Sequence, residues 1–129
     1  MGNDIDIVRA LFDAIARRDI TRVAALISEE TEFHAVTADV AGREGPYVGH
    51  AGLEQYFEDV EAIWDEIKLT PVDFEEVGDA ILVTGRVWAR GSGRVIDSST
   101  GWIFRVAGGK LTWAQVYESA AEAVAAARD

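Results

Sequence analysis

The residues best suited to chemistry in this 129-residue chain are one arginine and two carboxylates in its second half. Arg86, Asp97 and Glu118 occur in segments where apolar and polar residues alternate, a pattern typical of strands. A guanidinium inside a pocket binds a carboxylate or stabilises negative charge on an oxygen, and a desolvated carboxylate acts as a general base. We therefore predict Arg86 as the oxyanion or carboxylate contact, and Glu118 or Asp97 as the proton carrier.

Each of these three residues has a structural alternative. The alternative for Arg86 is an internal ion pair with Glu118 instead of a ligand contact. Glu118 lies just before the last expected helix, so its alternative is a solvated position at the rim. Asp97 falls on the opposite sheet face in the expected register, where Arg105 or Arg90 would pair with it. A bulge in the strand would instead turn Asp97 inward.

Large aromatic residues supply candidate pocket walls, since the chain holds four tryptophans. A flat hydrophobic box of this kind suits an aromatic or polycyclic ligand. The alternative is that these residues form an ordinary core. The predicted ligand-binding residues are Trp64, Trp88, Trp102, Phe57, Tyr56, Thr84 and Ser98.

The elements that must position these residues follow from the periodicity. Apolar residues at helical spacing predict a helix from about Asn3 to Ile15, a short helix through Ile27, and a third helix over 51–67. Glu32–Val36 is expected to be a strand and Thr37–Gly49 a loop. Period-two segments predict four hairpin-connected strands, and Ser119 with Glu122 forms a capping box that announces a last helix. The strands are expected at Leu69–Val77, Ala80–Arg90, Arg94–Val106 and Leu111–Glu118. This order predicts an α+β fold in which helices cover a curved antiparallel sheet.

The register of the central hairpin decides which residues share a face. A three-residue loop at 91–93 would place Arg90 opposite Arg94, so that even-numbered residues of both strands face a pocket. The opposite face would then carry Ile81, Val83 and Val87, a small apolar surface that needs a cover. We therefore expect a homodimer packed sheet to sheet, with a half-exposed sheet as the alternative.

The composition narrows the range of partners and sites. Twelve Lys and Arg against 23 Asp and Glu give a formal net charge of −11. Such a surface repels phosphates, so we expect neither a nucleic acid nor a membrane as a partner. The absence of cysteine excludes disulfides and thiol chemistry. Two histidines at unrelated spacing and the lack of nucleotide-binding motifs predict no metal and no cofactor.

The length of the chain is that of one domain, residues 1–129. Its start has no secretory signal, and no apolar stretch approaches the roughly 20 residues of a membrane span. We therefore expect a cytoplasmic protein.

Several local motifs resemble one known family over nearly the whole chain. Arg18-Asp19-Ile20 between two helices, Tyr47-Val48-Gly49 before the third helix, and the glycine turns between long strands resemble the SnoaL-like branch of the nuclear transport factor 2-like superfamily. This resemblance implies a cone-shaped α+β barrel, with the sheet wrapped around three helices and a short C-terminal helix. The superfamily includes ketosteroid isomerase, polyketide cyclases and limonene epoxide hydrolase, so the resemblance alone assigns no activity.

The catalytic positions of two relatives hold unsuitable residues here. The ketosteroid isomerase trio corresponds to Leu11, Ala35 and Trp102, and the cyclase pair corresponds to Trp102 and Val116. None of these side chains transfers a proton, which argues against both named reactions.

Two functions remain open. The first is a pocket protein for an apolar organic molecule, with cofactor-free isomerisation, cyclisation or hydrolysis as the reaction class. The second is a non-catalytic ligand-binding or association module that lacks the catalytic residues of the family.

Overall fold

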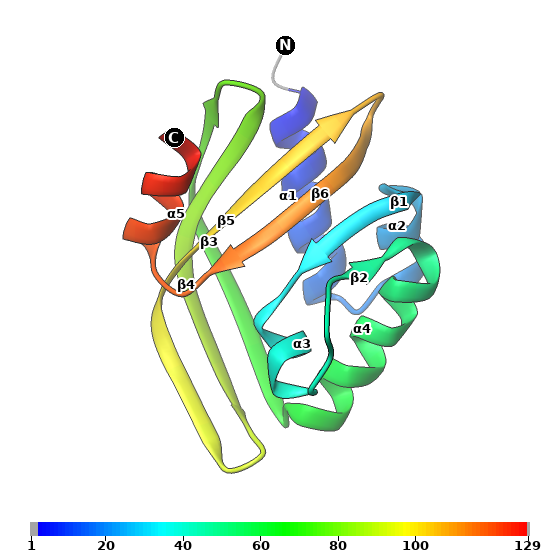
Figure 1. Ribbon diagram of the computed structural model, residues 1–129, viewed down its shortest axis with the longest axis vertical. Helices are drawn as coiled ribbons and strands as arrows, with labels where there is room; N and C mark the ends of the chain where they lie inside the picture. Colours follow the sequence, from blue (N-terminus) through cyan, green and yellow to red (C-terminus); the bar gives the residue numbers. More distant parts are fainter. Residues whose placement is uncertain (1–2, 129) are drawn as a thin grey trace.

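The computed structural model describes residues 3–128, which form five helices and one curved, open sheet of six strands (Figure 1). The α+β fold class expected from the sequence is therefore confirmed. The helices are α1 (Asn3–Ala16), α2 (Ile20–Ala25), α3 (Val36–Val40), α4 (Gly49–Ile63) and α5 (Ala120–Arg128). The strands are β1 (Ile27–His34), β2 (Tyr47–Val48), β3 (Glu66–Val77), β4 (Ala80–Gly91), β5 (Arg94–Ala107) and β6 (Lys110–Tyr117).

The strands lie in the order β2-β1-β6-β5-β4-β3. Strand β1 runs parallel to β6, and every other neighbouring pair is antiparallel. The long hairpins of β3 to β6 build most of the sheet, while β1 and β2 extend it next to α3 and α4 (Figure 1). This arrangement brings the end of β1, which lies early in the sequence, beside the last strand.

Strand β1 begins five residues earlier than the sequence predicted. Ile27 was expected in a helix, but β6 imposes extended structure on this segment. The Leu111 N–H donates to the carbonyl of Leu26 (2.8 Å), and the Thr31 hydroxyl donates to the carbonyl of Leu111 (2.6 Å). These contacts join residues about 80 positions apart, so local periodicity carried no sign of them.

The expected boundaries of the third helix and of the preceding loop were also wrong. Val36–Val40 forms the short helix α3 inside the expected loop. Helix α4 ends at Ile63, because Trp64 has an extended backbone and the Asp65 N–H donates to the Arg90 carbonyl (2.7 Å). Ile67 therefore belongs to β3, where it pairs with Ala89.

The main core lies between α1, α4 and one face of the sheet, which we call the inner face. Val8 of α1, Val60 of α4 and Val83 of β4 are fully buried there. Phe12 packs edge-on against Trp102 and Phe104, with ring centroids 5.0 and 5.6 Å apart. Aromatic edge-to-face contacts of this kind add to the stabilisation from burial.

The opposite face, which we call the outer face, is partly covered by α5. Leu82 and Ile103 of the sheet pack there against Ala123 of α5. A Cβ at Gly101 would overlap the Ala123 side chain, so glycine allows the helix to lie close to β5. The predicted cap is confirmed, since the Glu122 N–H donates to the Ser119 hydroxyl (3.1 Å).

The apolar sheet residues on which the expected dimer rested are buried on the inner face of this chain itself. Ile81 and Val83, which were expected to need a partner subunit, lie in the inner core of this chain, and Val87 lines a cavity on the same face. Their burial removes the main reason given for sheet-to-sheet pairing, and a homodimer stays a prediction that sedimentation at micromolar concentration tests. Among the described helices, none combines the length and apolar character that crossing a membrane requires.

Candidate functional site

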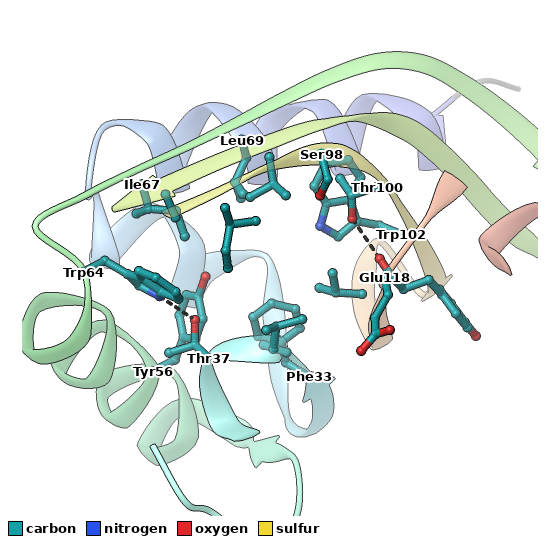
Figure 2. A pocket seen from close by; sticks show the side chains of 17 residues that line it. Phe33, Thr37, Tyr56, Trp64, Ile67, Leu69, Ser98, Thr100, Trp102 and Glu118 are labelled. Carbon is teal, nitrogen blue, oxygen red and sulfur yellow. Dashed lines mark hydrogen bonds between the residues drawn. The ribbon is translucent and has the colours of Figure 1, made fainter. Parts of the chain in front are cut away.

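A cavity of about 270 Å³ lies between the inner face of the sheet and the segment formed by α3, α4 and the end of β1 (Figure 2). One part of the sheet wall is aliphatic and is formed by Ile67, Leu69, Val87, Ala89 and Ile96, while β5 and β6 also contribute Ser98, Thr100, Trp102 and Val116. This volume is close to the lower end of the range of small-molecule sites, so it suits a molecule smaller than a typical drug.

The central hairpin puts a different set of residues in this cavity from the set expected. Gly91 pairs with Arg94, so the loop contains only Ser92 and Gly93, both with positive φ (52° and 75°). Two-residue loops of this kind match the twist of the strands. Val87 therefore lies beside Ser98, and odd-numbered residues of β4 share the inner face with even-numbered residues of β5.

Gly91 belongs to the strand because another segment approaches it closely. A Cβ at Gly91 would collide with the backbone of Ile63, Trp64 and Asp65, at the end of α4. The Ser92 hydroxyl also donates to the Ile63 carbonyl (2.9 Å). Contact with α4 thus fixes where the hairpin turns, and nothing within the three-residue motif indicates this contact.

The corrected register moves Arg86 away from the cavity. Arg86 donates from Nη2 to Oδ1 of Asp97 (3.0 Å) on the outer face, where both side chains are more than half exposed. The expectation that Arg86 lies on a pocket face is wrong, and Asp97 faces outward with a partner different from the two expected. Trp88 and Thr84 lie on the same outer face, for the same reason of register.

Five of the predicted site residues do come together around the cavity. They come from three parts of the chain. Helix α4 supplies Tyr56 and its C-cap residue Trp64, strand β5 supplies Ser98 and Trp102, and the segment after β6 supplies Glu118. These residues are Tyr56, Trp64, Ser98, Trp102 and Glu118. Phe57 is buried and packs edge-on against Tyr56, but it is not part of the lining. The functional roles assigned to all of these residues stay predictions.

The residues on the α3 side of the cavity were not predicted from the sequence. Phe33 at the end of β1 and Thr37 of α3 line it, and Trp64 Nε1 donates to the Thr37 hydroxyl (3.2 Å) (Figure 2). This buried bond holds α3 against the end of α4. Thr37 lay in an expected loop with no apolar period, so no local signal pointed to it.

The interior of the cavity is uncharged over the described residues that line it. Tyr56 is 5% exposed, and burial raises the pKa of its hydroxyl to about 12, so the hydroxyl is neutral at physiological pH. The Thr100 hydroxyl donates to the carbonyl of Tyr117 (2.8 Å). Glu118 is exposed and lies at the edge of the lining, so its carboxylate marks the opening (Figure 2).

A buried ion pair anchors the chain that leads into α4. Asp59 of α4 accepts hydrogen bonds from Arg43 (2.5 and 2.8 Å), from the Tyr47 hydroxyl (2.7 Å) and from Gln55 (3.0 Å). The hydrogen bonds from Arg43 hold the pKa of the Asp59 carboxyl well below its usual value of 3.8. This network fixes the loop after α3 against the helix that carries Tyr56.

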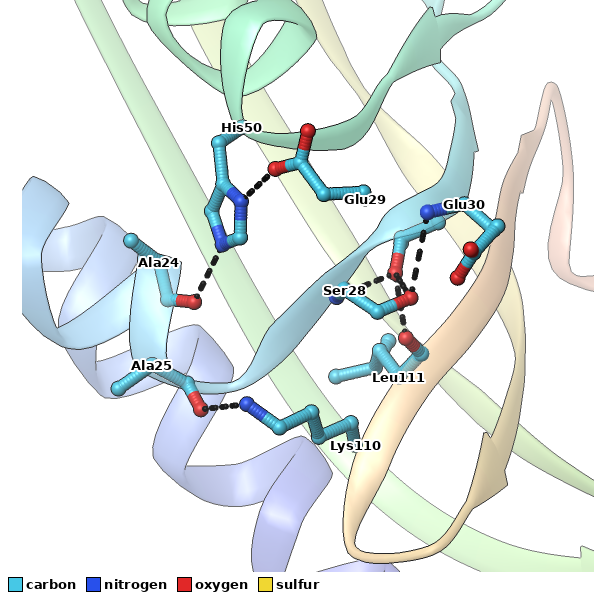
Figure 3. A network of polar contacts seen from close by, with 9 residues as sticks. Ala24, Ala25, Ser28, Glu29, Glu30, His50, Lys110 and Leu111 are labelled. Atoms are coloured by element: carbon cyan, nitrogen blue, oxygen red, sulfur yellow. Dashed lines mark hydrogen bonds and ion pairs between the residues drawn. The ribbon is translucent and has the colours of Figure 1, made fainter.

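The beginning of α4 has a second anchor, His50. Its Nε2 contacts the carbonyl of Ala24 (3.0 Å), and its Nδ1 contacts the carboxylate of Glu29 (Figure 3). Since both partners are acceptors, both ring nitrogens carry a proton in this arrangement. The hydrogen bond that His50 donates to Glu29 raises the pKa of His50 above 6.5, the bond to the Ala24 carbonyl adds to this shift, and partial desolvation and Lys110 oppose it.

We expect this shift to be visible in a pH titration of the His50 ring by NMR. The midpoint should lie above 6.5 in the wild type and fall in Glu29→Gln, because the substitution removes the charge that favours the imidazolium. The contribution of this ion pair to stability is present at pH values below 6.5 and is lost as the pH rises through the folded-state pKa. A midpoint unchanged by Glu29→Gln would show that the contact does not persist in solution.

Comparison with known proteins agrees with this architecture. A model of the SnoaL-like domain matches residues 8–114. A nuclear transport factor 2-like protein of unknown function from Burkholderia pseudomallei has a similar structure, with a TM-score of 0.80, 24% identity, and 97% of each chain covered. TerC, co-crystallised with polyporic acid, gives a TM-score of 0.77 at 21% identity, covering 98% of this chain and 99% of its own.

A putative polyketide cyclase from Sinorhizobium meliloti is also similar, with a TM-score of 0.69 at 17% identity and coverage of 87% of this chain and 94% of its own. At these identities the structural likeness shows the fold alone. A sequence comparison with curated proteins gave no match. The domain match spans most of the chain, and together with the cone-like sheet and its helices it shows that this protein belongs to the SnoaL-like family.

Proposed function

We propose that this protein binds a small, flat, apolar organic molecule in the cavity of the inner face. The observation that carries the proposal is a cavity of about 270 Å³ whose walls are aliphatic and aromatic. Burying a flat molecule against such walls gives a favourable hydrophobic contribution without a charged partner. The organic ligand present in the TerC crystals is consistent with a site of this kind.

The lining favours binding over acid–base catalysis. Two of the positions that correspond to catalytic groups of ketosteroid isomerase, Ala35 and Trp102, line this cavity, and neither side chain transfers a proton. Arg86 and Asp97 pair with each other on the outer face. Proton transfer needs a group within hydrogen-bond reach of the reacting atom, and the described interior supplies only hydroxyls and two indoles.

Calorimetric titration with two-ring aromatic compounds tests the proposal. Ile96→Trp fills the cavity and should weaken binding at least tenfold. Val95→Trp places the same side chain one residue away, at a position that is 68% exposed, and should leave the affinity unchanged. Equal affinities of wild type and Ile96→Trp would place the binding site elsewhere, and no binding by the wild type would overturn the proposal.

A cofactor-free isomerase, cyclase or hydrolase is the second candidate, because Glu118 stands at the opening of the cavity. If a bound compound is turned over, Glu118→Gln should lower kcat by about 100-fold or more, the usual size of a general-base contribution. Glu122→Gln in α5 removes another exposed carboxylate, one that does not line the cavity, and serves as the control. Turnover unaffected by Glu118→Gln would exclude Glu118 as the proton carrier.

A further inference from the structure

Two buried polar side chains of the cavity lack a hydrogen-bond partner within the described chain. Trp102 is 3% exposed and Tyr56 is 5% exposed, yet neither its indole nitrogen nor its hydroxyl forms a hydrogen bond with residues 3–128. Every fully enclosed side-chain nitrogen and oxygen of the described residues does have a partner. The free atoms of Trp102 and Tyr56 therefore border open space, and both residues line the cavity.

Figure 2 shows how the two groups lie. Tyr56 extends from α4 towards the sheet, with its hydroxyl at the leading end. The indole nitrogen of Trp102 is on the side of the ring that faces the cavity, next to Ser98. The two groups approach the cavity from different walls, with aliphatic side chains of the sheet between them.

The hydrogen-bonding character of these groups is asymmetric. An indole nitrogen only donates, whereas a neutral phenol hydroxyl both donates and accepts. The Thr37 hydroxyl accepts a hydrogen bond from Trp64, and the Thr100 hydroxyl donates its proton to the Tyr117 carbonyl, so the Thr100 oxygen can only accept from a ligand. Among the described lining residues, the Trp102 indole is therefore the unpaired group that can only donate, because the Ser98 and Tyr56 hydroxyls can donate or accept.

The charge around the cavity limits the kind of acceptor. None of the described residues that line it is cationic, and the one charged side chain, Glu118, is negative and stands at the opening. The chain as a whole carries a formal charge of −11. A carboxylate or phosphate bound in the cavity would lie near this negative charge and would find no compensating cation among the described lining residues, which disfavours anionic ligands.

We propose, building on the function proposed above, that the ligand carries an uncharged oxygen acceptor and that the Trp102 indole N–H, aided by the Tyr56 hydroxyl, selects for it. The ligand class is a neutral aromatic ketone, quinone or ether. A purely apolar molecule of the same shape leaves the donors unpaired on binding, and an aromatic acid brings a charge that the site does not neutralise. Trp102 is thus a specificity-determining residue.

Three probes of nearly equal shape test this inference by calorimetry. These are 2-acetylnaphthalene, 2-isopropenylnaphthalene, in which a CH₂ replaces the carbonyl oxygen, and 2-naphthoate. The wild type should bind the ketone about five- to tenfold more tightly than the alkene, the usual effect of one hydrogen bond, and should bind the carboxylate most weakly.

The variants assign the preference to a residue. Trp102→Phe keeps an aromatic ring and removes the donor, so the ketone and the alkene should bind with nearly equal affinity. Trp88→Phe makes the same change on the outer face and should keep the preference. Tyr56→Phe should reduce it in part. Because the wild type itself is compared with matched ligands, the test does not depend on the stability of any variant.

Each outcome has a separate meaning. If the ketone and the alkene bind the wild type equally, or if Trp102→Phe keeps the full preference, the inference is wrong while binding in the cavity stands. If 2-naphthoate binds most tightly, the conclusion about charge is wrong. If none of the three probes binds, the proposed function and the inference that rests on it both fail.

Discussion

Replacing Asp59 by asparagine is expected to lower the free energy of unfolding by about 2–3 kcal/mol. The Asp59 side chain is 10% exposed and accepts hydrogen bonds from Arg43, Tyr47 and Gln55. Asparagine has nearly the same shape but no charge, and its amide group places a donor where the carboxylate accepts. Removing one member of a buried ion pair typically costs 3–5 kcal/mol, and the partial exposure of Arg43 reduces this cost. Urea denaturation at neutral pH measures the change.

Asp97→Asn is the matched control for this experiment. Asp97 also pairs with an arginine, but 59% of its side chain is exposed and its partner Arg86 is similarly accessible. Exposed pairs contribute little, so we expect a change within about 0.5 kcal/mol. Equal effects of the two substitutions would contradict the view that Asp59 organises a buried network.

The pH dependence follows from the direction of the Asp59 shift. Its pKa in the folded protein lies below the usual value of 3.8, so the stability that it contributes is fully present only above about pH 5. This contribution decreases as the pH falls below that value, because protons bind the unfolded chain first. Asp59→Asn should therefore lose less stability than the wild type between pH 5 and pH 3. If the free energy of unfolding of the two proteins falls by the same amount between pH 5 and pH 3, the lowered pKa assigned to Asp59 is wrong.

Replacing Gly91 by alanine is the second change with a large expected effect, about 2–4 kcal/mol of destabilisation. The new Cβ would meet backbone atoms of Ile63, Trp64 and Asp65, and backbone gives way less easily than a flexible side chain. The end of α4 would have to move away from β4, and with it Trp64, which lines the cavity. We therefore expect weaker ligand binding as well as a lower melting temperature.

Gly108→Ala separates this collision from the ordinary cost of replacing a turn glycine. Gly108 has a φ of 60°, and a Cβ there would have no neighbour within 4 Å. Backbone strain alone should then cost about 1 kcal/mol, and ligand binding should not change. A Gly91→Ala variant no less stable than Gly108→Ala would show that α4 does not constrain the hairpin.

The periodicity of the sequence determined the fold class and most of the elements. Helical spacing located α1 and most of α4, and alternation with glycine turns located β3 to β6. The capping box of Ser119 and Glu122 was also visible, because a cap depends on residues three positions apart. These features are local, and local patterns survive in a single sequence.

The tertiary structure decided which faces these elements present. The side chains of a strand alternate with period two, so a change of one residue in the loop at Ser92 sends Arg86 outward and Val87 inward. The approach of α4 to Gly91 makes that choice, and the two segments are about 30 residues apart. The extended segment at Ile27 and the placement of Thr37 against Trp64 likewise depend on distant contacts. The sequence by itself therefore determined what kinds of residues are available, while packing between distant segments decided which of them meet in the cavity.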